Sequence, residues 1–121
     1  MPSLELTTNV RVPDPKAFTL KLSELGARVL GKPEAYITVQ YTYNDTITFA
    51  GTHDPAFVLR IVSLGNLNHE QNEKYTRELS HFLKEHLGLQ SNRGYIVFED
   101  PGNSFMGYDG KTFGTIFGKP S

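Results

Sequence analysis

Residues 55–64 read PAFVLRIVSL and carry the strongest structural signal in the chain. From Phe57 to Leu64 the run is almost wholly apolar, which predicts a strand. Residues 57–62 are apolar on both sides of that strand, so both faces of its sheet need cover. The run is far too short to cross a bilayer and contains Arg60, so no membrane insertion is expected.

The part of the chain before this run predicts a strand, a helix and a second strand. Residues 3–8 alternate polar and apolar side chains, as in a half-buried strand. A helix is expected from the turn at Pro13-Asp14 to Gly31-Lys32-Pro33, because glycine suits a left-handed cap and proline cannot continue a helix. Its apolar side chains recur at helical spacing: Phe18, Leu22, Leu25 and Val29. Residues 36–43 are rich in β-branched and aromatic side chains, which predicts the second strand.

The second part of the chain repeats this order. The strand at 57–64 precedes an amphipathic helix that ends near Gly88, and residues 95–98 form the last strong strand. Each half opens just after a proline, and each second strand begins Tyr-Ile. We therefore predict an α/β fold built from a pseudo-twofold βαβ repeat, with one four-stranded mixed sheet and both helices on one face. Residues 47–50 form a short apolar stretch, and residues 100–121 are expected to be loop plus short edge strands.

The second face of the predicted sheet indicates that the protein is an oligomer. Only two helices are expected, and they cover one face, so the remaining apolar face needs another copy of the chain. A length of 121 residues suits one domain with one modest core.

Composition and motifs exclude several classes of function. A net charge of −1 gives no basic face for nucleic acid, and the absence of cysteine excludes disulfides and thiolate metal sites. The four histidines show no metal-ligand spacing, and no glycine-rich phosphate-binding motif occurs. No metal and no cofactor are expected. No apolar leader follows Met1, so a cytoplasmic location is expected.

The amino terminus is the best candidate for chemistry. After loss of Met1, Pro2 would present a secondary amine, a base that no other position can offer. In an apolar pocket near Lys32 its charged form would be disfavoured by desolvation and by like-charge repulsion. A neutral amine of this kind suits general-base catalysis. The alternative is that Pro2 merely leads a strand.

A series of short motifs runs from the amino terminus to Phe113. They are Met1-Pro2, Thr8-Asn9-Val10, Gly31-Lys32-Pro33 with Tyr36-Ile37, Phe49-Ala50-Gly51, Asp54-Pro55-Ala56, Ser63-Leu64-Gly65, Asn72 and Tyr95-Ile96. Each is weak alone, but their order and spacing resemble the macrophage migration inhibitory factor and D-dopachrome tautomerase family.

The resemblance implies a homotrimer of βαββαβ subunits whose sheets form a central barrel, with one site at each subunit interface. It implies an isomerase, a cofactor-free keto–enol tautomerase of phenylpyruvate-like α-keto acids and dopachrome analogues. Residues 1–121 then form one domain of this kind. Residues 114–121 are a C-terminal tail that packs over a neighbour or over the pocket rim.

The same resemblance assigns the site residues. Pro2 is the catalytic base, and Lys32 binds the substrate carboxylate with the backbone of Leu64 alongside. Tyr95 is the aromatic residue that the neighbouring subunit contributes. The pocket walls are Tyr36, Met106, Tyr108 and Phe113.

The sequence departs from the family's cytokine member at two site positions and in one further segment. Val97 stands where that protein has asparagine, so one polar contact to the substrate is missing. Tyr108 stands where it has tryptophan. Residues 56–59 replace its Cys-x-x-Cys segment, so the oxidoreductase activity proposed for that member does not apply here.

Other interpretations stay open at this point. Lys32 also suits the end of a helix as a simple cation, Tyr36 and Tyr95 suit ordinary strands, and Met106 and Phe113 suit a core. A second function is a secreted cytokine-like ligand that binds a receptor, released without a signal peptide and with weak or vestigial tautomerase activity. A third is a scaffold that keeps the fold without the chemistry.

Overall fold

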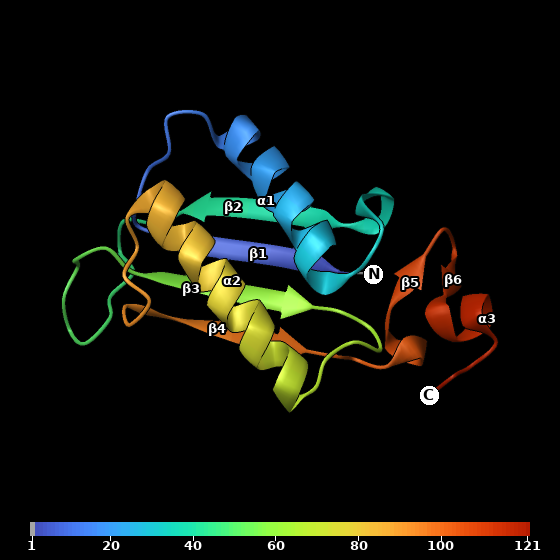
Figure 1. Cartoon of the computed structure of the whole chain (residues 1–121). Helices are drawn as coiled ribbons and strands as arrows, with labels where there is room; N and C mark the ends of the chain where they lie inside the picture. Colours follow the sequence, from blue (N-terminus) through green and yellow to red (C-terminus); the bar gives the residue numbers. More distant parts are fainter. Residues whose placement is uncertain (1) are drawn as a thin grey trace.

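The computed structural model describes residues 2–121, and a four-stranded mixed sheet lies at its centre (Figure 1). The strands are β1 (Ser3–Thr8), β2 (Thr38–Tyr43), β3 (Phe57–Val62) and β4 (Gly94–Glu99), in the order β2-β1-β3-β4. β1 is parallel to β2 and antiparallel to β3, and β3 is parallel to β4. The predicted α/β fold with a mixed sheet is confirmed. The predicted loss of Met1 concerns a residue outside the described range.

Two long helices, α1 (Pro15–Leu30) and α2 (His69–Leu87), lie side by side on one face of the sheet (Figure 1). Asp14 caps α1 by accepting a hydrogen bond from the backbone nitrogen of Ala17 at 3.1 Å. Gly31 ends it in the left-handed conformation, with φ of 66°. The predicted limits of this helix are therefore confirmed. α2 ends in the same way at Gly88.

The main core lies between the sheet and these helices. Alternate strand residues point into it, and four of them have no exposed surface: Leu4, Leu6, Leu59 and Ile61. Leu22 of α1 and Leu79 of α2 are equally buried against them. Burial of each such side chain stabilises the fold by about 1.5–3 kcal/mol.

The opposite sheet face is open in the single chain and has a mixed character. Val58 and Val97 are partly exposed there. Arg60 lies on β3, opposite Val97. It forms ion pairs with Glu5 of β1 at 3.3 Å and Glu99 of β4 at 2.5 Å. The expectation of an apolar second face is thus only half right, because charged side chains occupy its centre.

One detail of the chain between β1 and β3 differs from expectation. The strand expected at 36–43 begins at Thr38, because the segment after Pro33 forms a 3-10 turn, η1 (Glu34–Tyr36). The apolar stretch at 47–50 lies between β2 and β3. It leads into a tight turn in which Ala50 and Gly51 both have positive φ, 53° and 75°.

The C-terminal segment forms a small unit beyond the N-terminal end of β1 (Figure 1). It comprises η2 (Asn103–Phe105), β5 (Gly107–Tyr108), β6 (Lys111–Thr112) and α3 (Phe113–Phe117). The turn between β5 and β6 uses Asp109 and Gly110, both with positive φ, as a two-residue hairpin requires. The expected short strands form, but they pair with each other in a separate two-stranded sheet and not at the edge of the main sheet. The expectation of loop after them is wrong, because α3 forms there.

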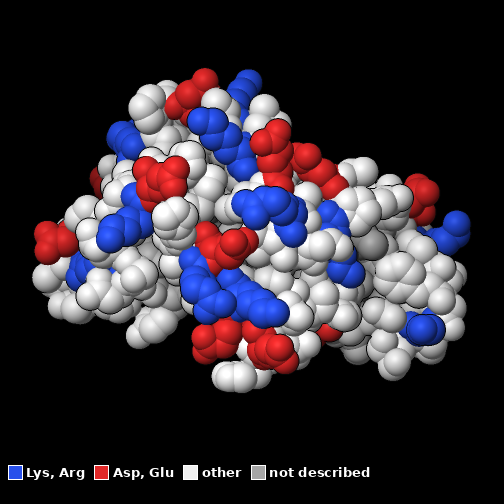
Figure 2. Space-filling model, viewed as in Figure 1, with Lys and Arg blue, Asp and Glu red and all other residues white. Residues whose placement is uncertain are grey.

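Lys, Arg, Asp and Glu are interspersed over the helical face, whereas the C-terminal unit is mostly uncharged on this side (Figure 2). Within residues 2–121, no helix combines the length and the apolar character needed to span a bilayer.

Candidate active site

Pro2 lies at the start of β1, and its side chain is fully buried. Its carbonyl oxygen accepts a hydrogen bond from the backbone nitrogen of Thr38 at 3.1 Å, which continues the ladder between β1 and β2. Pro2 borders a hollow of about 200 Å³. The other predicted site residues that line it are Tyr36, Met106, Tyr108 and Phe113.

Three of these residues form one aromatic wall. The rings of Tyr36 and Tyr108 meet edge to face at 5.6 Å between centroids, and Tyr108 stacks on Phe113 at 6.0 Å. Phe113 is only 3% exposed, and its backbone nitrogen donates to the carbonyl oxygen of Met106 at 2.9 Å. The 3-10 turn η1 supplies Tyr36 and the C-terminal unit supplies the rest, so the wall joins segments far apart in sequence.

Lys32 and Leu64 are brought together, but not on the wall of the hollow. Lys32 follows the cap of α1, and its Nζ donates a hydrogen bond to the carbonyl oxygen of Leu64 at 3.2 Å. Neither residue is among the described residues that line the Pro2 hollow. The loop after β3 is held in place by Asn66, which accepts from Ser63 at 2.6 Å and donates to Leu30 at 3.0 Å.

Tyr95 and Val97 lie elsewhere in the single chain. Both are on the open face of β4, where Tyr95 is 66% exposed and Val97 is 43% exposed. Tyr95 contacts Phe49, with ring centroids 5.5 Å apart, and Val97 lies opposite Arg60 in the sheet. Neither is among the described lining residues of the Pro2 hollow, so one chain alone does not unite the predicted site.

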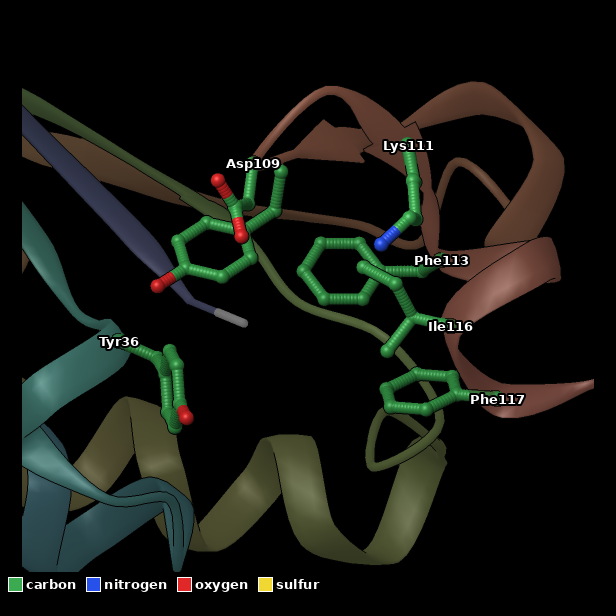
Figure 3. A pocket seen from close by; sticks show the side chains of 7 residues that line it. Tyr36, Asp109, Lys111, Phe113, Ile116 and Phe117 are labelled. Carbon is green, nitrogen blue, oxygen red and sulfur yellow. The ribbon is translucent and has the colours of Figure 1, made fainter.

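A second hollow of about 430 Å³ adjoins the first, and no prediction from sequence included it. Tyr36, Tyr108 and Phe113 line both hollows. Ile116 and Phe117 of α3 enclose the second one, with Asp109 and Lys111 at its edge (Figure 3). The sequence did hold a signal for them, since Phe113, Ile116 and Phe117 have the i, i+3, i+4 spacing of one helix face.

The arrangement suits acid–base chemistry on a small apolar molecule. Aromatic and aliphatic groups dominate the Pro2 hollow, and the described residues that line it include no charged side chain. Within residues 2–121, no cluster of three or more histidine, aspartate or glutamate side chains is placed to hold a metal ion. An amine at the floor of the hollow would therefore be its principal proton acceptor.

Comparison with known proteins agrees with this geometry. The family model for macrophage migration inhibitory factor matches residues 1–114. A macrophage migration inhibitory factor homolog of Trichuris trichiura is 40% identical over 114 residues, which are 93% of this chain and 100% of that protein. The macrophage migration inhibitory factor of Mus musculus is 33% identical over 114 residues, covering 93% of this chain and 99% of the mouse protein.

Solved structures of macrophage migration inhibitory factor proteins also resemble this chain. The homologue from Prochlorococcus marinus superimposes with a TM-score of 0.86 at 28% identity, over 93% of this chain and 99% of that one. The protein from Trichinella spiralis also gives 0.86, at 29% identity over 92% and 99%. The matched region ends where α3 begins, so Ile116 and Phe117 lie beyond it. The chain belongs to the macrophage migration inhibitory factor family, within the tautomerase superfamily.

Proposed function

We propose that the protein is a cofactor-free keto–enol tautomerase of phenylpyruvate-like α-keto acids and of dopachrome analogues. The base is the amine of Pro2 after Met1 is removed. The observation that carries this proposal is the burial of Pro2 at the floor of an apolar hollow with an aromatic wall. Membership of the family supports tautomerase activity in general.

In the proposed reaction the Pro2 amine takes a proton from the carbon next to the substrate carbonyl. The electron pair of that C–H bond becomes the C=C bond of an enolate. The carbonyl oxygen takes up a proton from water to give the enol, and the protonated Pro2 amine returns its proton to water. The reverse reaction returns the proton to carbon. The aromatic wall favours this role for Pro2, because an apolar environment disfavours the charged form of an amine.

Lys32 is the proposed carboxylate-binding residue. Its Nζ uses one donor on the Leu64 carbonyl, and an ammonium has three. The half-buried position of Lys32 limits the competition from water for a bound carboxylate.

Tyr95 and Val97 enter the proposed site from a neighbouring subunit of a homotrimer. Their exposure on the open face of the sheet supports this arrangement, since exposed apolar side chains grouped on one face mark an interaction surface. The Arg60 ion pairs on the same face would lie inside the barrel.

Pro2→Gly tests the proposed base. Mass spectrometry first establishes whether Met1 has been lost, and phenylpyruvate tautomerisation is then measured. General-base catalysis contributes roughly 10²- to 10⁴-fold, so Pro2→Gly should lower turnover by about that factor. Pro55→Gly is the matched control, because Pro55 precedes the strand of the second half and should leave turnover unchanged. Unchanged turnover in folded Pro2→Gly protein would reject the amine as base.

The names of the relatives favour a second candidate, a secreted ligand that acts on macrophages through a receptor. The same variant separates the two functions. Inhibition of macrophage migration by Pro2→Gly protein at the potency of the unmodified protein would support a signalling role that does not need the chemistry. Absence of inhibition by the unmodified protein would reject this candidate.

A further inference from the structure

The helix α3 turns an apolar face away from the main core. Ile116 and Phe117 are 42% and 43% exposed, although their spacing from Phe113 is that of a buried helix face. The side chains of all three point from α3 into the second hollow, toward Tyr36 (Figure 3). Single exposed apolar side chains are ordinary on a protein surface. Several that line one hollow indicate a binding site for a ligand.

This hollow is continuous with the Pro2 site through shared side chains. Tyr36, Tyr108 and Phe113 line both. The aromatic wall continues into α3, where Phe113 and Phe117 lie 5.2 Å apart between ring centroids. The Pro2 hollow alone is smaller than the roughly 300–1,000 Å³ of most ligand pockets. The hollow under α3 has about twice the volume of the Pro2 hollow, about 430 Å³ against about 200 Å³, and shares three lining side chains with it.

The chain holds α3 in place over this space. Asn103 donates to the carbonyl oxygen of Lys119 at 2.8 Å, and Ser104 donates to that of Pro120. Gly114 is packed so closely that an added Cβ would lie 3.0 Å from Cα of Pro120. The residues that follow α3 are therefore tied to η2, which holds the helix against the C-terminal unit.

The charges at the edge of the hollow indicate what it accepts. Asp109 and Lys111 both border it and carry opposite charges, so they offer no net charge to a ligand. The remaining lining groups are aromatic or aliphatic. A neutral apolar group fits this lining better than a second carboxylate or a sugar.

We propose that the hollow under α3 is an extension of the substrate site that takes a second ring or long apolar arm of a 2-oxo acid. The inference rests on the proposed tautomerase function and adds its substrate class. It depends on Ile116 and Phe117, which lie beyond the segment shared with the family. The protein should therefore favour larger aryl substrates, and the preference should depend on these two residues outside the shared segment.

The test compares phenylpyruvate with 3-(biphenyl-4-yl)-2-oxopropanoate, which adds one ring in line with the first. In the double variant Ile116→Ala/Phe117→Ala, kcat/KM for the biphenyl acid should fall at least about tenfold more than kcat/KM for phenylpyruvate, because the second ring loses its apolar wall. Leu20→Ala is the matched control, an exposed apolar residue on α1. It should leave the ratio of the two values unchanged.

Equal losses on both substrates, or no loss on the biphenyl acid, would overturn the inference while the tautomerase proposal stands. Loss of the oligomer in the double variant together with equal losses would assign the α3 face to another copy of the chain, and would also overturn it. If neither acid is turned over, calorimetric titration with the biphenyl acid decides. Binding at least about tenfold weaker in the double variant would support the extended site, and equal binding would reject it.

Discussion

The Nζ of Lys32 donates a hydrogen bond to the carbonyl oxygen of Leu64, across 3.2 Å. This bond joins the end of α1 to the loop that follows β3. It fixes the ammonium at one place although the side chain is long and flexible, and it leaves two N–H donors for a ligand. A carboxylate that reaches this position would meet a cation already held in position, at a smaller entropic cost.

Lys32→Ala should raise KM for phenylpyruvate more than it lowers kcat. A hydrogen bond to a charged group contributes about 1.5–3 kcal/mol, which corresponds to about a 10- to 100-fold change in KM. Lys21→Ala removes an exposed lysine from α1 and should leave KM unchanged. Steady-state kinetics on both variants checks this, and an effect on kcat alone would show that Lys32 acts on the transition state instead of binding substrate.

The limits of α1 could be predicted because local chemistry sets them. Asp14 and Gly31 act as caps through their own side chain or backbone, whatever the rest of the fold does. Tyr36 could not be placed in the same way. Its β propensity is real, but the hydrogen bond from its backbone nitrogen to the carbonyl oxygen of Pro33 closes a 3-10 turn instead.

The site was predictable in part for the same reason. Pro2 could be nominated from its chemistry, since a terminal secondary amine is unique, but the family resemblance was needed to prefer it over a proline that merely leads a strand. The second hollow was missed because α3 is only one turn long, so the i, i+3, i+4 spacing of its apolar residues is a weak signal for a helix. Whether Tyr95 and Val97 join Pro2 depends on a second chain, which no local pattern encodes.

The protein should be a trimer in solution. The open sheet face presents Val58, Tyr95 and Val97 to solvent in the single chain, and two helices cover only the other face. Size-exclusion chromatography with light scattering should give three times the mass of the chain. A stable monomer would contradict the barrel and, with it, the site shared between subunits.

Gly94→Ala should destabilise the fold by about 1–3 kcal/mol, because overpacking at a close contact forces the backbone to move. A Cβ at Gly94 would lie 2.2 Å from the carbonyl oxygen of Phe57. At Gly107 the nearest atom to an added Cβ is 3.4 Å away, so Gly107→Ala is the matched control. Urea denaturation of both variants measures the difference, and equal stability would show that β3 and β4 can separate without loss.

The free energy of unfolding should fall as the pH rises above about 10. Burial raises the pKa of Tyr75 above its ordinary 10.0. The unfolded chain therefore loses this proton first, so the stabilisation is fully present below the unfolded pKa and is lost as the pH rises through the folded one. Tyr41 also has a pKa raised by burial and adds to the effect.

Tyr75→Phe should reduce this alkaline loss, while lowering stability near neutral pH by about 1 kcal/mol. The neutral-pH cost arises because the phenol donates to the carbonyl oxygen of Asn66 at 2.9 Å. Urea denaturation at about pH 8 and about pH 11 gives both quantities. An alkaline loss of the same size in the variant would show that Tyr75 does not contribute to it.

Phenylpyruvate should be preferred over its 4-hydroxy analogue if Val97 faces the substrate ring. Valine offers no hydrogen bond to a hydroxyl at the far end of the ring, and a buried hydroxyl left unpaired costs about 1–3 kcal/mol. Val97→Asn supplies an amide at that position and should narrow the gap in kcat/KM between the two acids. Val58→Asn adds the same amide on the neighbouring strand of the open face and should leave the gap unchanged. Equal kcat/KM values for the two acids in the unmodified protein would show that Val97 lies away from the ring, in whichever subunit the substrate binds.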